Sequence, residues 1–433
     1  MYQVLQAMRR FRDEVYQAFG ASRDAAFELI DAIASSPHAR SAVEVSDSGL
    51  MRRGYASVYK GLERTRINEV RLRELLVQQA AASGELRVAG YMIQALDHTP
   101  YPRRSAPTVA DRGCVHGADG VVIGHQYSLL GRVMHEQGAW VGVEDCARIR
   151  TDQTPVQVGA EQVARLRQMS TDLHIITADS EYLTREMLDQ AHERTPLLIR
   201  LKSNRVLYHR PPPRRPGQRG RPRLHGRRVK LSDAHTLGPP DHAFELTAED
   251  GSRIDIAVFT GLHVRSHPHV HGCVIRVRAF HADGRRKFAR PMWLYWTGPL
   301  DMDWLTFWRV YLKRFCIESV HQFTKNALAW TSARLGDTER EERWTWLVML
   351  AYWQLLAAAP CAFDAHRPWQ KPMPHGRLPT PARVQRDYGH IFAAVGTPAR
   401  PPKPRGIAPG RPLGYRPAPR PRFDIVVKAK NTS

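Results

Sequence analysis

Two short apolar runs that each end in an aspartate constrain the fold of this chain most. Residues 88–97 read VAGYMIQALD and residues 173–179 read LHIITAD. Continuous apolar runs of this length are typical of strands buried on both faces of a sheet. Sites of open α/β sheets form at the carboxyl ends of such strands, so Asp97 and Asp179 are candidate site residues. A strand-terminal aspartate also commonly begins a turn, and that interpretation of Asp97 stays open.

The pattern around these two runs predicts an α/β fold. Segments rich in β-branched residues alternate with segments whose apolar residues recur at helical spacing. The other elements that we predict for this part are, in chain order, strands at 121–134 and 139–145 joined as a hairpin, a helix at 155–169, a helix at 182–194, a strand at 195–202 and a closing helix at 303–328.

The segment YLKRFCIESVHQFTK at 311–325 carries four functional side chains at regular spacing. On a continuous helix, Tyr311, Arg314, Glu318 and Lys325 would share one stripe about 60° wide, at about 100° per residue. A carboxylate that can hold a metal ion, beside cations that can hold phosphates, suits work on a nucleic-acid backbone. A solvent-exposed helix with ordinary charges is the alternative interpretation.

The charge balance points to a polyanionic partner. The chain has 433 residues, with 64 Lys and Arg against 42 Asp and Glu, which gives a formal charge of +22. This excess favours nucleic acid over a membrane surface. The five cysteines include no CxxC pair, which fits a reducing cytoplasm and predicts no zinc motif. The most apolar stretch, 344–359, is shorter than a membrane span and predicts a buried helix.

The spacing of Tyr, Arg, Glu and Lys resembles the YREK signature of cut-and-paste transposases from bacterial insertion sequences. These enzymes belong to the DDE superfamily, whose catalytic core is RNase H-like. The resemblance continues in YPRRSA after Asp97, in ERWTWLVMLAYWQLL after Lys325 and in PPKPRGIAPGRPLG near the C-terminus. It implies a bacterial, nucleoid-associated enzyme that cleaves DNA at the ends of an element and transfers the strand into target DNA.

The resemblance also implies the metal ligands. Asp97, Asp179 and Glu318 would be the catalytic residues and would bind two Mg²⁺ (or Mn²⁺) ions once DNA is present, because hard divalent cations take oxygen ligands. The TADSEYL segment resembles an Asp-Gly-x-Tyr motif of the family, with Ser180 where glycine is usual. Asp145 and Glu181 are alternative carboxylates nearby.

The remaining residues of the signature would contact DNA. By resemblance, Arg314 and Lys325 would hold the phosphates that flank the scissile bond, and Tyr311 would make a third backbone contact. Trp296, in MWLYWTG at 292–298, could stack on an unpaired base near the cut, but we favour packing in the core for these aromatic residues.

A run of basic residues at 210–230 holds nine Arg and Lys and no acid, and we predict a mobile loop there. Within it, QRGRPRLHG resembles the core of an AT-hook, in which an extended Gly-Arg-Pro places arginine in a narrow minor groove. Arg219, Arg221 and Arg223 are therefore candidate DNA contacts. A second such element lies at 408–415, and a generic basic loop is the alternative for both.

These expectations divide the chain into five parts. The whole fold is predicted as α/β, with an RNase H-like core of a mixed sheet flanked by helices and interrupted by a β-rich insertion. The parts are a helical N-terminal domain that could bind DNA ends (1–85), the first part of the core (86–202), a basic loop and β-rich insertion (203–302), the closing helices of the core (303–362) and a basic, Pro-rich tail (363–433).

The expected partner is double-stranded DNA, both as terminal inverted repeats of the element and as target, bound by a homodimer. Two other functions stay open. An RNase H-like nuclease or resolvase of branched DNA would keep the three carboxylates but would not need the four-residue signature or the insertion. A domesticated transposase would bind DNA without being an enzyme.

Overall fold

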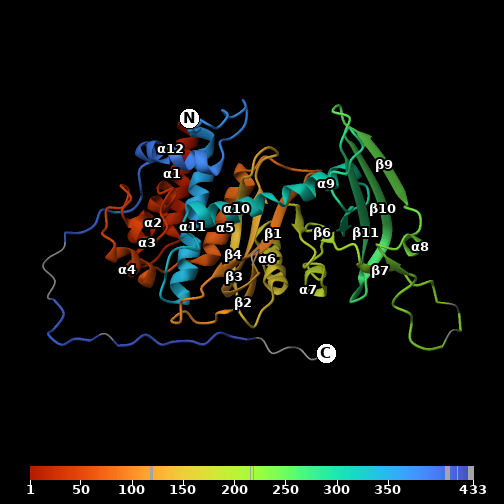
Figure 1. Ribbon diagram of the computed structural model, residues 1–433, viewed down its shortest axis with the longest axis horizontal. Helices are drawn as coiled ribbons and strands as arrows, with labels where there is room; N and C mark the ends of the chain where they lie inside the picture. Colours follow the sequence, from red (N-terminus) through yellow and green to blue (C-terminus); the bar gives the residue numbers. More distant parts are fainter. Residues whose placement is uncertain (118–119, 215, 218, 405–409, 417, 428–433) are drawn as a thin grey trace.

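The computed structural model describes residues 1–117, 120–214, 216–217, 219–404, 410–416 and 418–427. Figure 1 shows three parts side by side: a helical part that holds the N-terminus, a central sheet with helices on both faces, and a β-rich part that holds β9, β10 and β11. The fold class predicted from the sequence is therefore confirmed, including the helical N-terminal part and the β-rich insertion.

One mixed sheet of twelve strands runs through the central and β-rich parts. In its central portion the spatial order is β4-β3-β1-β5-β6, in which β1 pairs antiparallel with β3 and parallel with β5, and β5 pairs parallel with β6. This arrangement is that of an RNase H-like core. Its strands are β1 (Met92–Pro102), β2 (Gly113–Gly117), β3 (Gly120–Val133), β4 (Val141–Ile149), β5 (His174–Ala178) and β6 (Leu197–Leu201).

Two helices connect these strands on one face of the sheet. Helix α6 (Pro155–Met169) begins at a capping box, in which the Thr154 hydroxyl accepts from the Gln157 N–H, and Pro155 occupies the first turn. The helix predicted at 182–194 is mostly wrong, because only α7 (Arg185–Leu188) is helical there. His192 and Thr195 then form a short antiparallel β-bridge before β6, and the helix ends before this bridge.

The β-rich insertion continues the core sheet instead of forming a separate one. Strand β12 pairs antiparallel with β6, and β11 and β10 follow beyond it. The basic run predicted as a loop connects β7 to β8 at the free end of the sheet (Figure 1). The elements are β7 (Val206–His209), β8 (Arg228–Lys230), α8 (Ala234–Leu237), β9 (His242–Thr247), β10 (Arg253–Val264), β11 (His267–Phe280) and β12 (Met292–Trp296).

The N-terminal helices pack against the two last helices of the chain. A buried Arg12 joins them: it donates to Asp31 at 2.8 Å and to Tyr388 at 3.1 Å, and it also contacts Gln354. Segments from both ends of the chain therefore share one core. These helices are α1 (Tyr2–Gln17), α2 (Arg23–Ser35), α3 (Ala42–Ser46), α4 (Ala56–Arg64), α5 (Glu69–Ser83), α11 (Thr338–Ala358, followed by a 3₁₀ turn, Ala359–Cys361) and α12 (Pro381–Val395).

Helix α12 lies within the range predicted as a Pro-rich tail, so the extended part of the tail begins after it. Even there the chain returns to the sheet. The Phe423 N–H donates to the Pro107 carbonyl at 2.8 Å, and the Val426 N–H donates to the Arg112 carbonyl at 2.7 Å. Backbone pairing of the last described residues, which composition does not reveal, holds this segment beside β2.

The closing helix predicted at 303–328 is divided into α9 (Trp304–Lys313) and α10 (Cys316–Ala327). Between them the amides of Arg314, Phe315, Ile317 and Glu318 each donate to the carbonyl three residues earlier, the tighter 3₁₀ pattern. The single continuous helix predicted through Arg314 is therefore wrong, because this tighter turn divides it.

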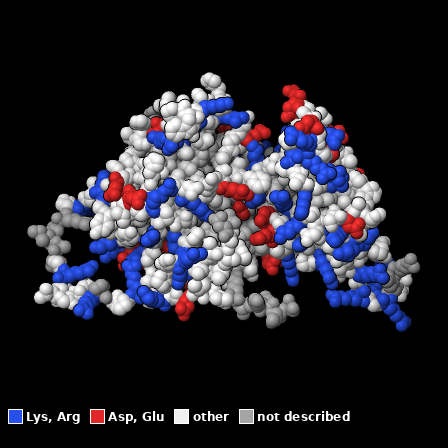
Figure 2. Space-filling view, in the orientation of Figure 1, with Lys and Arg blue, Asp and Glu red and all other residues white. Residues whose placement is uncertain are grey.

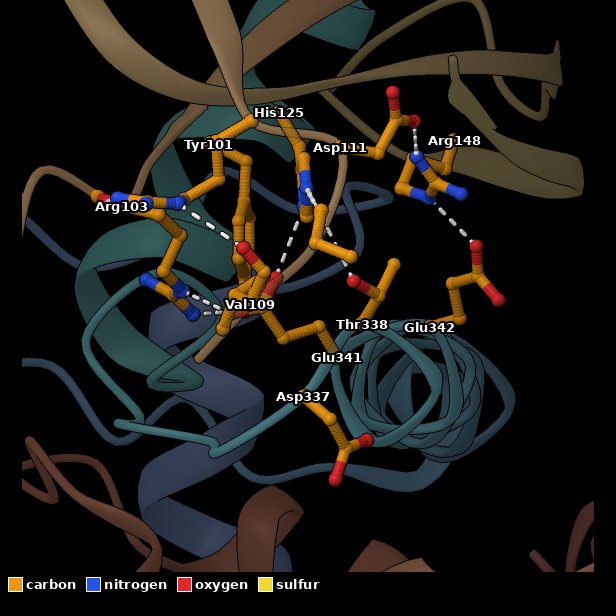
Figure 3. A network of polar contacts seen from close by, with 12 residues as sticks. Tyr101, Arg103, Val109, Asp111, His125, Arg148, Asp337, Thr338, Glu341 and Glu342 are labelled. Atoms are coloured by element: carbon orange, nitrogen blue, oxygen red, sulfur yellow. Dashed lines mark hydrogen bonds and ion pairs between the residues drawn. The ribbon is translucent and has the colours of Figure 1, made fainter. Parts of the chain in front are cut away.

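A buried polar network fixes the start of α11 to the sheet (Figure 3). Glu341 is fully buried and accepts a hydrogen bond from Arg103, while His125 Nδ1 lies 3.0 Å from its other oxygen. Arg103 also donates to the Thr331 carbonyl at 2.8 Å and to the Ala333 carbonyl at 2.9 Å. The charge of Glu341 is thus balanced by side chains that come from the end of β1 and from β3.

Helix α11 is the apolar run noted in the sequence, and it is a core helix as predicted, with nearly all of its residues from Trp344 onward buried. In the part of the chain that the structure describes, none of the helices combines the length and apolar composition that a membrane span requires.

We predict that Glu341→Ala lowers the free energy of unfolding by about 3–5 kcal/mol, because it leaves Arg103 and His125 buried without their carboxylate. Denaturant unfolding measures this loss. The matched control is Glu339→Ala on the same helix, where an exposed carboxylate pairs with Arg343 and should contribute less than about 1 kcal/mol. Equal losses for the two variants would contradict the role given to the network.

Candidate active site

The pairing register places Asp97 level with Asp179. In the parallel β1–β5 pair, Ala95 lies opposite Thr177. Two residues further along each strand stand Asp97 and Asp179. Because neighbouring strands are about 4.8 Å apart, the two carboxylates start from adjacent backbone positions at the same edge of the sheet.

Both aspartates belong to the face of the sheet that α9 and α10 cover. Ile93, Ala95 and Ile175 pack in the core that includes α9, α10 and α11, whereas Leu96 packs in the core that includes α6. Side chains alternate along a strand, so Asp97 shares the side of Ala95, and Asp179 shares the side of Ile175. The two carboxylates therefore face the helices that carry the rest of the signature.

Arg314 joins the carboxylates. Its Nη2 donates to Glu318 Oε1 at 2.9 Å, and its Nη1 lies 3.6 Å from Asp97 Oδ2. Burial alone would lower the pKa of Arg314, but Tyr311, Asp97, Glu318 and Asp179 together raise it. Arg314 thus contacts Asp97 and Glu318, and Asp179, level with Asp97 at the same edge of the sheet, adds to the negative charge around this guanidinium.

His321 and Arg314 together determine the state of Asp97, whose side chain is 15% exposed. Burial by itself would raise the pKa of Asp97, yet His321, Arg314 and His98 more than offset this effect and lower the pKa. Asp97 is therefore ionised at neutral pH. Glu318 is half exposed, so its carboxylate opens to solvent, whereas the carboxylate of Asp97 is enclosed.

His321 is a member of the site that the sequence analysis missed. Its Nε2 lies 3.6 Å from Asp97 Oδ2, and burial lowers its pKa in spite of that carboxylate. The signal was present in the sequence, since His321 stands three residues after Glu318 and four before Lys325, on the same face of α10.

Several buried polar atoms around Asp97 have no hydrogen-bond partner among the described residues. Buried polar groups are nearly always paired, so a cluster of unpaired ones marks a place where other polar groups are expected to bind. The atoms are Tyr311 Oη, Arg314 Nε and Nη1, and both ring nitrogens of His321.

Lys325 lies one turn further along α10 and donates to the Thr99 hydroxyl on β1. Burial lowers its pKa to about 8, and Asp97 offsets only part of this effect. A lysine with such a pKa is still mostly charged at neutral pH, and a phosphate beside it would stabilise that charge.

Two predicted DNA contacts are placed in the protein interior. The Tyr311 side chain is buried and burial raises its pKa, which Arg314 and Arg200 partly oppose. The Trp296 ring is fully buried against Phe307, with its Nε1 donating to the Pro299 carbonyl at 2.8 Å. The prediction that Trp296 stacks on a base is therefore wrong, because the core already occupies both faces of the strand that carries it.

The alternative carboxylates do not join the three acids. Asp145 on β4 is buried between Arg73 and Arg165, at 2.7 and 2.9 Å. Glu181 is more than half exposed and lies 3.9 Å from His98. The geometry therefore favours Glu318 as the partner of the two aspartates.

The donor set fits a divalent cation in its chemistry, because three carboxylates supply hard oxygen ligands. In the arrangement seen, Arg314 bridges Asp97 and Glu318, and no group of three His, Cys, Asp or Glu side chains in the described ranges converges closely enough to hold an ion.

The three arginines of the basic loop that are candidate DNA contacts are exposed to solvent. Arg219, Arg221 and Arg223 are all exposed, and Gly220 between them has a φ of 96°, which favours glycine. Figure 2 shows Lys and Arg side chains gathered on the β-rich insertion and on the loop below it. The second Gly-Arg-Pro element begins outside the described residues.

Comparison with family models gives one finding for this region. Residues 141–255 match the model described as DDE superfamily endonuclease. The match covers a minority of the chain, from β4 to the start of β10, and it includes Asp179 but neither Asp97 nor Glu318. Together with the RNase H-like fold it supports a nuclease of the DDE type. Comparison with curated proteins finds no match.

We predict that the affinity for DNA, measured by fluorescence anisotropy without divalent metal, falls as the pH rises from about 7 to about 9. Lys325 loses its charge as the pH passes its pKa of about 8, and one such group accounts for a loss of at most about tenfold. Lys325→Arg stays charged throughout and should abolish this dependence. An unchanged pH profile in Lys325→Arg would assign the titration to another group.

Proposed function

We propose that this protein is a transposase, which cleaves DNA at the ends of a mobile element and transfers the freed strand into target DNA. The observation that supports the proposal is that Arg314 contacts both Asp97 and Glu318, while strand register sets Asp179 level with Asp97 at the same edge of an RNase H-like sheet. A purely structural ion pair would need only one carboxylate to balance the charge of the Arg314 guanidinium. Three acids around one cation leave negative charge that divalent ions can neutralise.

In the mechanism we propose, Asp97, Asp179 and Glu318 hold the ions. When bound, two Mg²⁺ or Mn²⁺ ions would polarise the scissile phosphate and activate the attacking oxygen. The protein's own groups position the DNA. Arg314 balances the carboxylates before DNA arrives and is close enough to turn to a phosphate oxygen, for which its planar fork is suited.

Lys325 would hold a neighbouring phosphate as a point charge, from its position above Thr99. His321 helps to keep Asp97 ionised. Tyr311, which is buried, would position Arg314 rather than reach DNA: Arg314 lies 5.9 Å from the centre of the Tyr311 ring.

The surface supports a DNA partner. The formal charge of +22 and the exposed arginines of the 210–230 loop favour binding to a phosphate backbone along more than one face. We propose that two copies act together on paired terminal repeats, as the resemblance implies. A nuclease of branched DNA would use the same carboxylates, so a strand-transfer assay with the matching element ends separates the two functions.

We predict that Asp97→Ala, Asp179→Ala and Glu318→Gln each reduce metal-dependent cleavage of the terminal repeats by at least about 100-fold. Removal of a group that only orients a metal ligand typically lowers metal affinity or activity by about 10–100-fold. Removal of the ligand itself should lower activity at least as much. Calorimetric titration of Mn²⁺ should show the same loss without any catalytic readout. Glu181→Gln, the neighbouring exposed carboxylate, is the control and should keep wild-type activity.

Cleavage at the wild-type rate by any of the three variants would refute the assignment of that residue. Loss of cleavage with undiminished Mn²⁺ binding would instead show that the residue does not hold the metal.

We also predict that Arg219, Arg221 and Arg223 bind phosphates. Changing all three to alanine should make the dependence of log affinity on log salt shallower by about 3, near one unit for each contact. Anisotropy over a salt series measures the slope. The control is alanine at Arg150, Arg185 and Arg285, which are equally exposed but already paired with carboxylates.

The control variant has the same net charge as the loop variant. Equal slopes for the two would show that the loop acts only through overall charge and makes no contact of its own.

A further inference from the structure

The carboxyl end of β6 carries a hollow that the proposed catalytic residues do not occupy. It has a volume of about 830 Å³ and begins at Ser180, the residue after Asp179. Its wall crosses from the core to the insertion, since it includes Asn204 and Arg205 before β7 and Arg265 at the turn between β10 and β11. The candidate active site and the insertion therefore meet here.

A second hollow of about 420 Å³ adjoins the first. The two share Leu201, Lys202 and Asn204, and the second adds Arg200 and Arg290. The hollows together bend around the end of β6, from the residue beside Asp179 to the beginning of β12. Their common wall means that one extended ligand could occupy both.

The walls of the two hollows are cationic. Arg200, Lys202, Arg265 and Arg290 are exposed, and none of them makes an ion pair with a carboxylate among the described residues. Among the residues that the structure describes, no Asp or Glu lines either hollow. Unpaired cations that face one another across a hollow repel, so this arrangement favours an anionic ligand.

Arg200 connects the hollows to the active site through the sheet. In the β5–β6 pair, Ala178 lies opposite Ile199, so Asp179 and Arg200 occupy the next level. Asp97, Asp179 and Arg200 thus follow one another across three parallel strands. The charge of Arg200 also acts on the Tyr311 hydroxyl, next to Arg314.

We propose that the two hollows bind the phosphodiester backbone of the DNA strand that continues past the cut, with Arg200, Lys202, Arg265 and Arg290 as phosphate contacts. The proposal rests on the function proposed above and assigns a path for its substrate. Strand spacing explains why this path begins where it does: Arg200 stands one strand beyond Asp179, so a phosphate next to the scissile one meets it first.

Arg205 has a different role in the same wall. Its Nη2 donates to the Leu183 carbonyl at 2.9 Å, which ties the segment before β7 to the loop after Asp179. This contact keeps the floor of the first hollow in place while the unpaired cations remain available to the ligand.

The test measures binding without metal, so that it does not depend on cleavage. Labelled DNA carrying a terminal repeat with flanking sequence is titrated with the full-length Lys202→Ala/Arg265→Ala variant over a salt series. We expect affinity to fall about tenfold at moderate salt and the salt slope to become shallower by about 2, one unit for each cation. The charge-keeping pair Lys202→Arg/Arg265→Lys should restore both.

The matched control is Arg185→Ala/Arg285→Ala, which removes the same charge from paired surface residues. Thermal unfolding of each variant confirms that the fold is kept. Wild-type affinity and slope in Lys202→Ala/Arg265→Ala, or a loss no greater than in the control, would overturn the inference.

A labelled mononucleotide distinguishes the source of the phosphate. We expect no saturable binding of the mononucleotide to the wild type, because a single phosphate meets only part of the path. If the wild type binds the mononucleotide tightly and Lys202→Ala/Arg265→Ala does not, the ligand of the hollows is a nucleotide and not a DNA strand. If the inference fails while Asp97→Ala still abolishes cleavage, the proposed function stands. If Asp97→Ala cleaves normally, the function itself fails.

Discussion

The parallel pairing of β1 with β5 is the constraint on which the candidate site depends. It sets Asp97 and Asp179 at adjacent positions, and the pairing of β5 with β6 extends the same level to Arg200. A slip of one residue in either strand would turn its carboxylate to the opposite face, where α6 packs. Register therefore decides whether the acids meet, and the apolar side chains of β1 and β5 enforce the register by filling two different cores.

Buried charges then hold the helices to this sheet. Glu341, matched by Arg103 and His125, fixes α11, and Arg12, matched by Asp31, joins the first helices to the last ones. Removing one partner of such a group is costly, so these contacts resist local rearrangement. At the candidate site the balance is different: Arg314 faces three acids, while Tyr311 and His321 keep buried atoms without partners.

The strands of the core and the β-rich insertion could be predicted from the sequence, because each depends on local patterns, and the assignment of the three acids to one site stays a prediction. The helix at 182–194 could not, since it ends after one turn and a short local bridge between His192 and Thr195 follows it. The continuous helix through Arg314 failed for a similar reason: a 3₁₀ turn separates α9 from α10, which a spacing at 100° per residue does not foresee. Trp296 was assigned to DNA although its strand is buried on both faces.

The sequence by itself determined which residues could do chemistry here: aspartates after apolar runs, a glutamate among cations, and an excess of positive charge for a polyanion. These properties belong to residue types and their neighbours along the chain. Only the tertiary structure decided that Arg314 stands among the acids, that His321 joins them, and that unpaired cations surround the end of β6. Those facts depend on distances between segments up to about half the chain apart, which local propensity does not encode and which packing and strand register alone establish.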